Sequence, residues 1–172
     1  MTAIQRRDAI FQAVSSAQQP LSATALAQRF SVSRQVIVND IALLRAAGNH
    51  ISATPRGYLA EQEPQGLLRQ VACVHDAAGT AAELNAMVDC GCTVLDVIVE
   101  HPIYGQLTAP LQITSRYDVQ QFVMKMKDSE ALPLSMLTEG VHLHTLICPS
   151  EEIYLHLKDT LRAMGILLNE MQ

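Results

Sequence analysis

Two histidines separated by one residue, His142 and His144, are the clearest chemical feature of this sequence. Side chains two residues apart on a β-strand lie on the same face, so both imidazoles can approach one metal ion. His75 follows an apolar segment of strand-like composition, and Glu83 lies on the segment after it. Three imidazole nitrogens and one carboxylate suit Zn²⁺, Ni²⁺ or Fe²⁺ and do not suit Mg²⁺ or Ca²⁺. These four residues are the candidate metal ligands.

The spacing of these residues leaves a second interpretation open, because His75 and His142 are far apart in the sequence. In that interpretation the two histidines of the pair occupy an exposed strand face. Glu83 then serves as a helix cap, since Thr80-Ala81-Ala82-Glu83 fits the capping-box pattern. The sequence also allows a hydrolase with an open metal position, although only Asp76 or His101 offers a general base.

A second set of polar residues lies where two short helices are expected to meet. The helices span residues 21–30 and 34–48, capped by Ser22 and Ser33, and Gly48 ends the second one. A three-residue polar turn between two helices indicates a helix-turn-helix. Arginine and the side-chain amides can make paired contacts to guanine and adenine. The residues expected to meet base edges, at or near the start of the second helix, are Ser33, Arg34, Gln35, Val38 and Asn39.

Two further segments complete a DNA-binding unit of the winged type. Residues 2–16 are expected to form a first helix. Residues 51–53 and 57–59 are expected to form a hairpin whose tip carries Arg56, a side chain placed to contact phosphate or the minor groove. A winged helix used only for protein contacts is the alternative, and the arginines and the Ser-Arg-Gln start of the recognition helix argue against it.

The charge distribution also indicates that the N-terminal part of the chain binds DNA. The net charge is −5 overall, but residues 1–60 carry six arginines against two aspartates, and the remainder is strongly acidic. Only the first part is therefore expected to meet a polyanion. The composition, 49% apolar and 17% charged, is that of a soluble globular protein. No membrane span or signal peptide is expected, which predicts a cytoplasmic protein whose four cysteines are reduced thiols.

The polar segment 61–66, which holds Pro64 and Gly66, predicts a boundary between domains 1–61 and 66–172. In the second domain strands and helices alternate, without a glycine-rich phosphate loop. We therefore predict an α+β protein, in which the winged helix-turn-helix is followed by a small α/β sandwich. Its strands are expected at 67–75, 93–99, 105–111 and 141–148, and its helices at 80–89, 115–127 and 150–164.

The sequence resembles two known families in succession. Residues 21–59 resemble the winged helix-turn-helix of bacterial biotin-type and sugar-type regulators, through the elements L-S-x-x-x-L-A, V-S-R-Q-x-I and R-G-Y-L. The motifs His75-Asp76, Glu-His-Pro-Ile-Tyr-Gly at 100–105 and Gly-Val-His-Leu-His-Thr at 140–145 resemble the three-histidine (3H) domain. This succession is similar to the layout of the niacin-responsive transcription repressors.

The resemblance implies a function and a set of ligands. It implies a repressor of genes for niacin uptake and NAD synthesis, which binds a double-stranded DNA operator as a homodimer and takes nicotinic acid as co-repressor. It also implies a divalent transition metal in the sensor domain, with nickel favoured over zinc or iron, held by His75, Glu83, His142 and His144. His101, with Tyr104 or Arg69 assisting, is expected to contact the effector. The alternative is a metalloregulator in which the metal itself is the signal.

Overall fold

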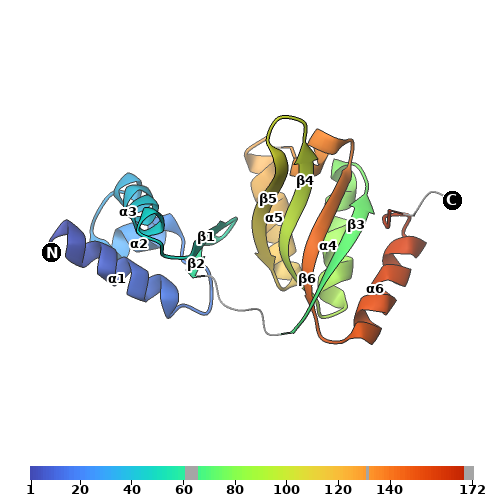
Figure 1. Ribbon diagram of the computed structural model, residues 1–172, viewed down its shortest axis with the longest axis horizontal. Helices are drawn as coiled ribbons and strands as arrows, with labels where there is room; N and C mark the ends of the chain where they lie inside the picture. The colour runs from blue at the N-terminus through green and yellow to red at the C-terminus, as the bar shows by residue number, and fades with distance from the viewer. Residues whose placement is uncertain (61–65, 131, 169–172) are drawn as a thin grey trace. The chain divides into compact units, whose positions relative to one another are not determined.

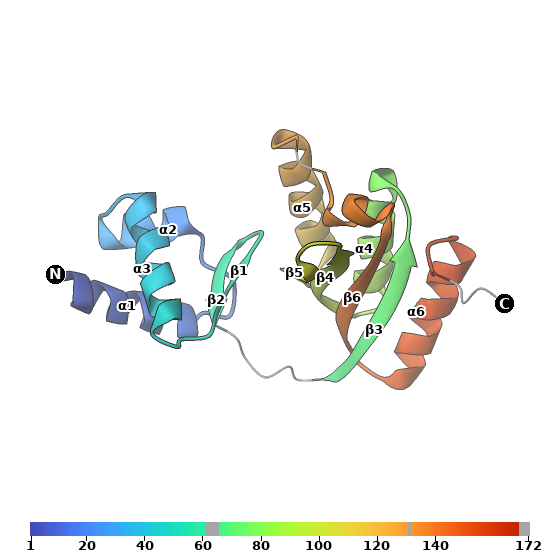
Figure 2. The same ribbon diagram turned by 45° about the horizontal axis from the view of Figure 1, so that its top comes forward.

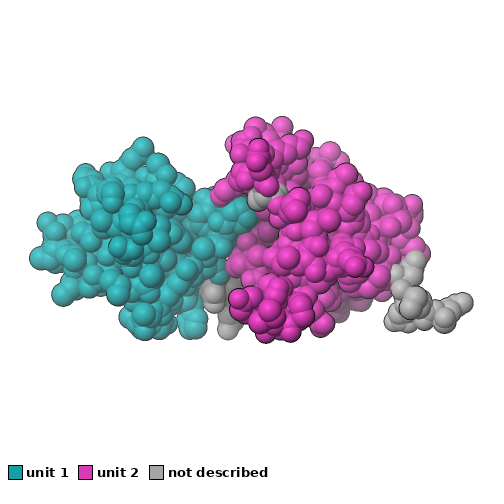
Figure 3. All heavy atoms as spheres, turned by 90° about the horizontal axis from the view of Figure 1, so that it is seen from above, with its two compact units in different colours: residues 1–63 teal, residues 64–172 magenta. Residues whose placement is uncertain are grey.

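The computed structural model describes residues 1–60, 66–130 and 132–168 (Figure 1). The chain divides into two compact units, Met1–Glu63 and Pro64–Gln172, which Figure 3 colours separately. Each unit has its own hydrophobic core. The predicted linker, residues 61–66, lies outside the described residues except for Gly66. Within the described ranges, no helix has the length and apolar character needed to cross a membrane.

The first unit is a three-helix bundle with a β-hairpin attached. Ile37, Ile41 and Leu44 are buried on one side of the third helix, as the apolar spacing predicts. The Ser33 hydroxyl accepts a hydrogen bond from the Val36 N–H, which confirms the predicted cap. Gly48 has a φ of +91°, a backbone conformation in which glycine is not strained. The elements are α1 (Ala3–Ser15), α2 (Ala23–Phe30), α3 (Arg34–Ala46), β1 (Ile51–Thr54) and β2 (Gly57–Ala60).

A buried ion pair fastens α1 to α3. The Asp40 side chain is almost fully buried, and its carboxylate lies 2.6 Å from Arg6 Nε and 3.8 Å from Arg7 Nη1. A buried carboxylate is stable only when it is paired, so these two arginines neutralise Asp40. Two of the six arginines in the basic charge balance are therefore engaged inside the unit.

The second unit is a two-layer α/β sandwich, as predicted. Its antiparallel sheet has the strand order β3-β6-β4-β5, and the long helices pack side by side on one face of that sheet (Figures 1 and 2). The strands are β3 (Leu67–Val74), β4 (Thr93–His101), β5 (Gly105–Ile113) and β6 (Val141–Cys148). The helices are α4 (Thr80–Asp89), α5 (Arg116–Asp128) and α6 (Glu151–Ala163), with the 3-10 turns η1 (Ala77–Gly79) and η2 (Leu134–Thr138).

Strand β6 supplies the side chains that matter most for the site. Its burial alternates along the strand, so that His142, His144, Leu146 and Cys148 all lie on the helix-covered face. Two of these side chains are imidazoles set into a hydrophobic core. Between Val94 and Ile98 the β4–β6 register shifts by one residue, and this bulge turns the backbone near Asp96 toward β6.

Candidate functional site

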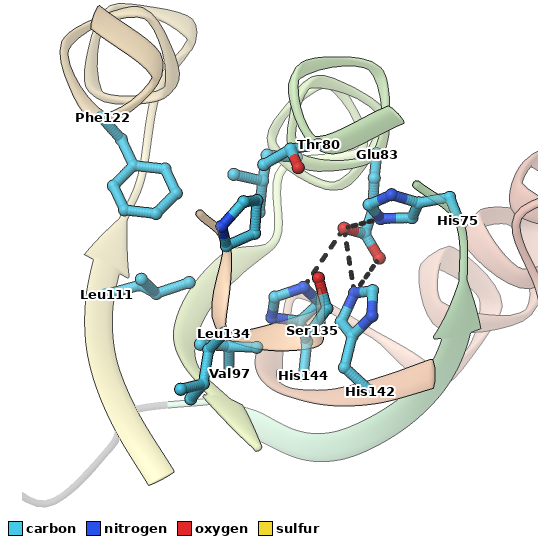
Figure 4. A pocket seen from close by; sticks show the side chains of 12 residues that line it. His75, Thr80, Glu83, Val97, Leu111, Phe122, Leu134, Ser135, His142 and His144 are labelled. Atoms are coloured by element: carbon cyan, nitrogen blue, oxygen red, sulfur yellow. Dashed lines mark hydrogen bonds and ion pairs between the residues drawn. The ribbon is translucent and has the colours of Figure 1, made fainter. Parts of the chain in front are cut away.

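Three histidines converge on one buried carboxylate inside the second unit (Figure 4). Glu83, from α4, places Oε2 2.7 Å from His75 Nε2, at the end of β3. Its Oε1 lies 2.9 Å from His142 Nε2, and Oε2 lies 3.3 Å from His144 Nε2, both on β6. Glu83 is 1% exposed, and His142 and His144 are each 3% exposed. The four residues predicted as ligands from the sequence are thus brought together.

The burial of these side chains contradicts the alternative in which they form a polar surface. His142 and His144 face the core, so they are not on an exposed strand face. The predicted capping box of α4 is also wrong: the N-cap is Gly79, which has no side chain to accept a bond, and Glu83 turns to the histidines. A carboxylate one turn into a helix can either complete a capping motif or reach the sheet beneath the helix. The Glu83 carboxylate reaches the sheet.

The other nitrogen of each ring is held by a backbone carbonyl. His75 Nδ1 lies 2.6 Å from the Asp76 oxygen, His142 Nδ1 lies 2.8 Å from the Gly140 oxygen, and His144 Nδ1 lies 2.6 Å from the Asp96 oxygen. A carbonyl oxygen only accepts hydrogen bonds, so each Nδ1 carries a proton and donates it. In a neutral imidazole the lone pair is then on Nε2. All three lone pairs would point at Glu83.

That arrangement requires positive charge between the rings and the carboxylate. Lone pairs facing a carboxylate repel it, whereas three imidazoliums around one carboxylate would leave excess buried charge, which is costly. Burial favours a raised pKa for Glu83, but rings that carry a proton on Nε2 donate to its carboxylate, and the contacts to His142, His144 and His75 then hold that pKa far below its ordinary value. Glu83, in turn, raises the pKa of His75. The donor set therefore fits a single divalent cation bound by three nitrogens and one carboxylate.

Cys73 is a neighbour of this cluster that the sequence analysis missed. It is fully buried on β3, and its Sγ, a carboxylate oxygen of Glu83 and a ring nitrogen of His142 all lie within 4.8 Å of one another. Burial, and then the Glu83 carboxylate, raises the pKa of the thiol well above its ordinary value. The signal was the spacing Cys73-x-His75, which the period of two along a strand places on one face.

Two glycines give His75 its place. A Cβ on Gly79 would lie 2.7 Å from the His75 ring, and a Cβ on Gly140 would lie 2.3 Å from the His75 carbonyl oxygen. The Gly140 carbonyl accepts from the His75 N–H over 3.3 Å and faces His142 Nδ1. The loop before β6 thus positions two of the three rings through its backbone.

Replacing Gly140 with alanine should therefore disturb the site specifically. Gly140 has a φ of +92°, and its added methyl would meet the backbone of His75. We expect G140A to lower the free energy of unfolding of the second unit by about 2–3 kcal/mol, the combined effect of strain and overlap. Denaturant unfolding followed by circular dichroism measures this change.

The G105A variant is the matched control, since Gly105 has a φ of +69° and open space around the added methyl. G105A introduces the backbone strain without a steric overlap, so we expect its free energy of unfolding to fall by only about 1 kcal/mol. Equal losses in the two variants would show that the contact with His75 is unimportant.

The residues predicted to contact the effector lie elsewhere in the unit. Arg69 binds Glu151 at the start of α6, with its Nε 2.9 Å from Oε2. His101 ends β4, and its Nδ1 accepts from the N–H groups of Ile103 and Tyr104 in the following turn. None of the three predicted residues is among those that line the pocket beside the histidine cluster.

The residues predicted to read DNA form an exposed face on α3. Ser33, Arg34, Gln35 and Asn39 are exposed, and Val38 is half-buried. Gln35 Nε2 donates to Asn39 Oδ1 over 3.0 Å, which holds the two amides in register one helical turn apart. In the hairpin, Arg56 Nη1 donates to Gln19 Oε1. The exposed start of α3 is the geometry of a recognition helix.

Together, the two units define a class of protein: a DNA-binding transcription regulator with a winged helix-turn-helix and a separate domain holding a buried histidine–carboxylate cluster. Comparisons with known proteins agree. The helix-turn-helix (HTH) domain family matches residues 6–59, and the 3H domain family matches residues 68–170. The transcription repressor NadR of Bacillus subtilis is 43% identical over 169 residues, which cover 96% of this chain and 94% of that protein.

A second relative, the probable transcription repressor NiaR of Thermotoga maritima, is 40% identical over 166 residues, which cover 96% of this chain and 95% of that protein. The chain therefore belongs to the family of 3H-domain transcription repressors. The resemblance inferred from the sequence motifs is thereby confirmed. Membership of this family sets the hydrolase alternative aside, because its members are repressors and not enzymes.

Proposed function

We propose that this protein is a cytoplasmic, metal-dependent repressor of genes for niacin uptake and NAD synthesis, with nicotinic acid as its co-repressor. Two relatives named as transcription repressors, one of them as a probable repressor, match this chain over nearly their full length, which supports the repressor role. The effector and the gene targets rest on the resemblance described above. The metal rests on the donor set in the second unit, and nickel is the favoured ion.

One observation carries the metal assignment: each ring nitrogen that faces away from Glu83 is held by a backbone carbonyl. Outer contacts of this kind fix the tautomer and orientation of metal-binding histidines. His75, Glu83, His142 and His144 would hold the ion, with Cys73 close by. When bound, the cation would supply a Lewis-acidic position for a carboxylate or a pyridine nitrogen.

The remaining residues act on the effector and on DNA. Val97, Leu111 and Phe122 line the pocket beside the cluster and would keep water from a bound ring. The exposed start of α3 would enter the major groove of DNA, and Arg56 would contact the DNA backbone beside that groove. In a homodimer, the effector would favour the spacing of two recognition helices that fits both half-sites of the operator.

The test is a calorimetric titration of nickel-loaded protein with nicotinic acid, repeated after chelation and desalting. We expect binding to the loaded protein and its loss on chelation. Nicotinamide, which lacks the carboxylate, is the control ligand. In parallel, fluorescence anisotropy with an operator selected by the protein itself should show tighter DNA binding when nickel and nicotinic acid are both present.

The two arms separate the competing functions. DNA binding that requires nickel but ignores nicotinic acid would favour the metalloregulator, in which the metal is the signal. Binding of nicotinic acid to the chelated protein with unchanged affinity would remove the metal from the effector site. Neither result would change the assignment of this chain to the repressor family.

A further inference from the structure

A small pocket opens directly beside the histidine cluster, and its walls are of two kinds (Figure 4). One side is polar, formed by the imidazoles and Glu83. The opposite side is apolar and includes Leu111 of β5, Phe122 of α5 and Leu134 of η2. The empty space of this pocket, its open mouth included, is about 330 Å³, so the pocket is small.

One buried polar atom in this pocket has no partner. Thr80, the first residue of α4, is 7% exposed, and its Oγ1 is buried without a hydrogen-bond partner among the described residues. The buried carboxylate and imidazoles of the same pocket all have such contacts. In the described part of the second unit, Thr80 Oγ1 is the only buried side-chain nitrogen or oxygen in this condition. A buried hydroxyl left unpaired destabilises a fold, so its presence in a pocket points to a ligand.

Thr80 also lies where the pocket meets the surface. A broad surface depression, lined by the first turn of α4 and by Val123, Met126 and Lys127 of α5, shares Thr80 and Pro133 with the inner pocket. Thr80 therefore lies between this depression and the histidine side of the inner pocket. Thr80 is therefore placed to contact the part of the ligand that is farther from the cluster.

We propose that Thr80 is a specificity-determining residue, whose hydroxyl donates a hydrogen bond to a flat heteroaromatic carboxylate held between the histidine cluster and the Phe122–Leu111 wall. This inference rests on the proposed function, because it concerns the effector of the same site. It moves the polar contact to the effector from His101, Tyr104 and Arg69 to a residue at the start of α4.

The variant T80V tests the hydroxyl, because valine keeps the shape of threonine and removes its polar atom. We expect T80V, loaded with nickel, to bind nicotinic acid about tenfold more weakly than the natural protein in calorimetry. We also expect the ligand-free variant to melt at the same or a higher temperature, since an unpaired buried hydroxyl has been removed. T80S, which keeps the hydroxyl, should stay within about threefold of the natural affinity.

T160V serves as the control, because Thr160 lies on α6, away from the pocket, and its hydroxyl donates to the His156 carbonyl oxygen. Unchanged nicotinic acid affinity in T80V would overturn the inference, and so would equal losses in T80V and T80S. A lower melting temperature in T80V would assign the hydroxyl a structural role instead, which also overturns it. If the natural protein itself fails to bind nicotinic acid, the proposed function fails first, and the two failures are distinguishable.

Discussion

The variant E83Q should lose tight metal binding while it remains folded. Glu83 is the only negatively charged side chain among the four predicted ligands, and its carboxylate contacts all three rings. Glutamine has the same shape, but its amide oxygen is a weak ligand. We expect the affinity for Ni²⁺ or Zn²⁺ to fall by about 100-fold or more, judged against the 10- to 100-fold effects of outer contacts alone. Competition with a chromogenic chelator measures the change.

Stability provides a second measurement on E83Q. Saturating metal raises the melting temperature of a protein that binds it only when folded, by an amount that follows its affinity. We expect this increase in the natural protein and little of it in E83Q. The metal-free variant should remain folded, because an amide N–H can donate to an imidazole lone pair that a carboxylate can only repel.

E100Q is the matched control, because Glu100 is an exposed glutamate on β4 and its replacement makes the same change in charge. Its metal affinity should equal that of the natural protein. If E83Q keeps full affinity, the carboxylate is no ligand, and other groups must hold the metal.

The features predicted well from the sequence are those that depend on short-range spacing. The two-residue period of β6 placed His142 and His144 on one face, whichever way the strand turned. The serine caps of α2 and α3 follow from side-chain bonds to an N–H three residues away, and both were predicted correctly. Such local interactions are written in neighbouring residues, so a single sequence suffices to find them.

The features that were missed or misplaced depend on contacts between distant segments. Thr80 and Glu83 fit a capping motif locally, and only the position of α4 above β6 directs Glu83 to the histidines. Arg69 is drawn to Glu151 by the packing of α6 beside β3. The pocket wall, with Leu111 on β5 and Phe122 on α5, brings together segments that share no motif. Tertiary packing determines where these side chains lie, and local sequence patterns do not predict it or predict it wrongly.

The variant R34A should separate base recognition from general attraction to DNA. Arg34 is the first residue of α3, exposed, and adjacent to the capping Ser33. A recognition helix presents its first residues to base edges, where arginine pairs with guanine. We expect R34A to weaken binding to the selected operator by about 1–3 kcal/mol and to relax sequence preference at one position of each half-site. Fluorescence anisotropy with the operator and with a scrambled duplex of equal length measures both effects.

R29A removes an equal charge from α2, where Arg29 is exposed and its guanidinium lies 5.7 Å from the Phe30 ring centre. The loss of a contact that serves only to attract phosphate weakens binding to all duplexes equally and reduces the salt dependence of binding by about one charge. We expect R29A to show that pattern and R34A to discriminate between the two duplexes. If both variants lose affinity equally on operator and scrambled DNA, Arg34 reads no base, and sequence recognition must come from the amides of Gln35 and Asn39, which are already joined by a hydrogen bond on the same face.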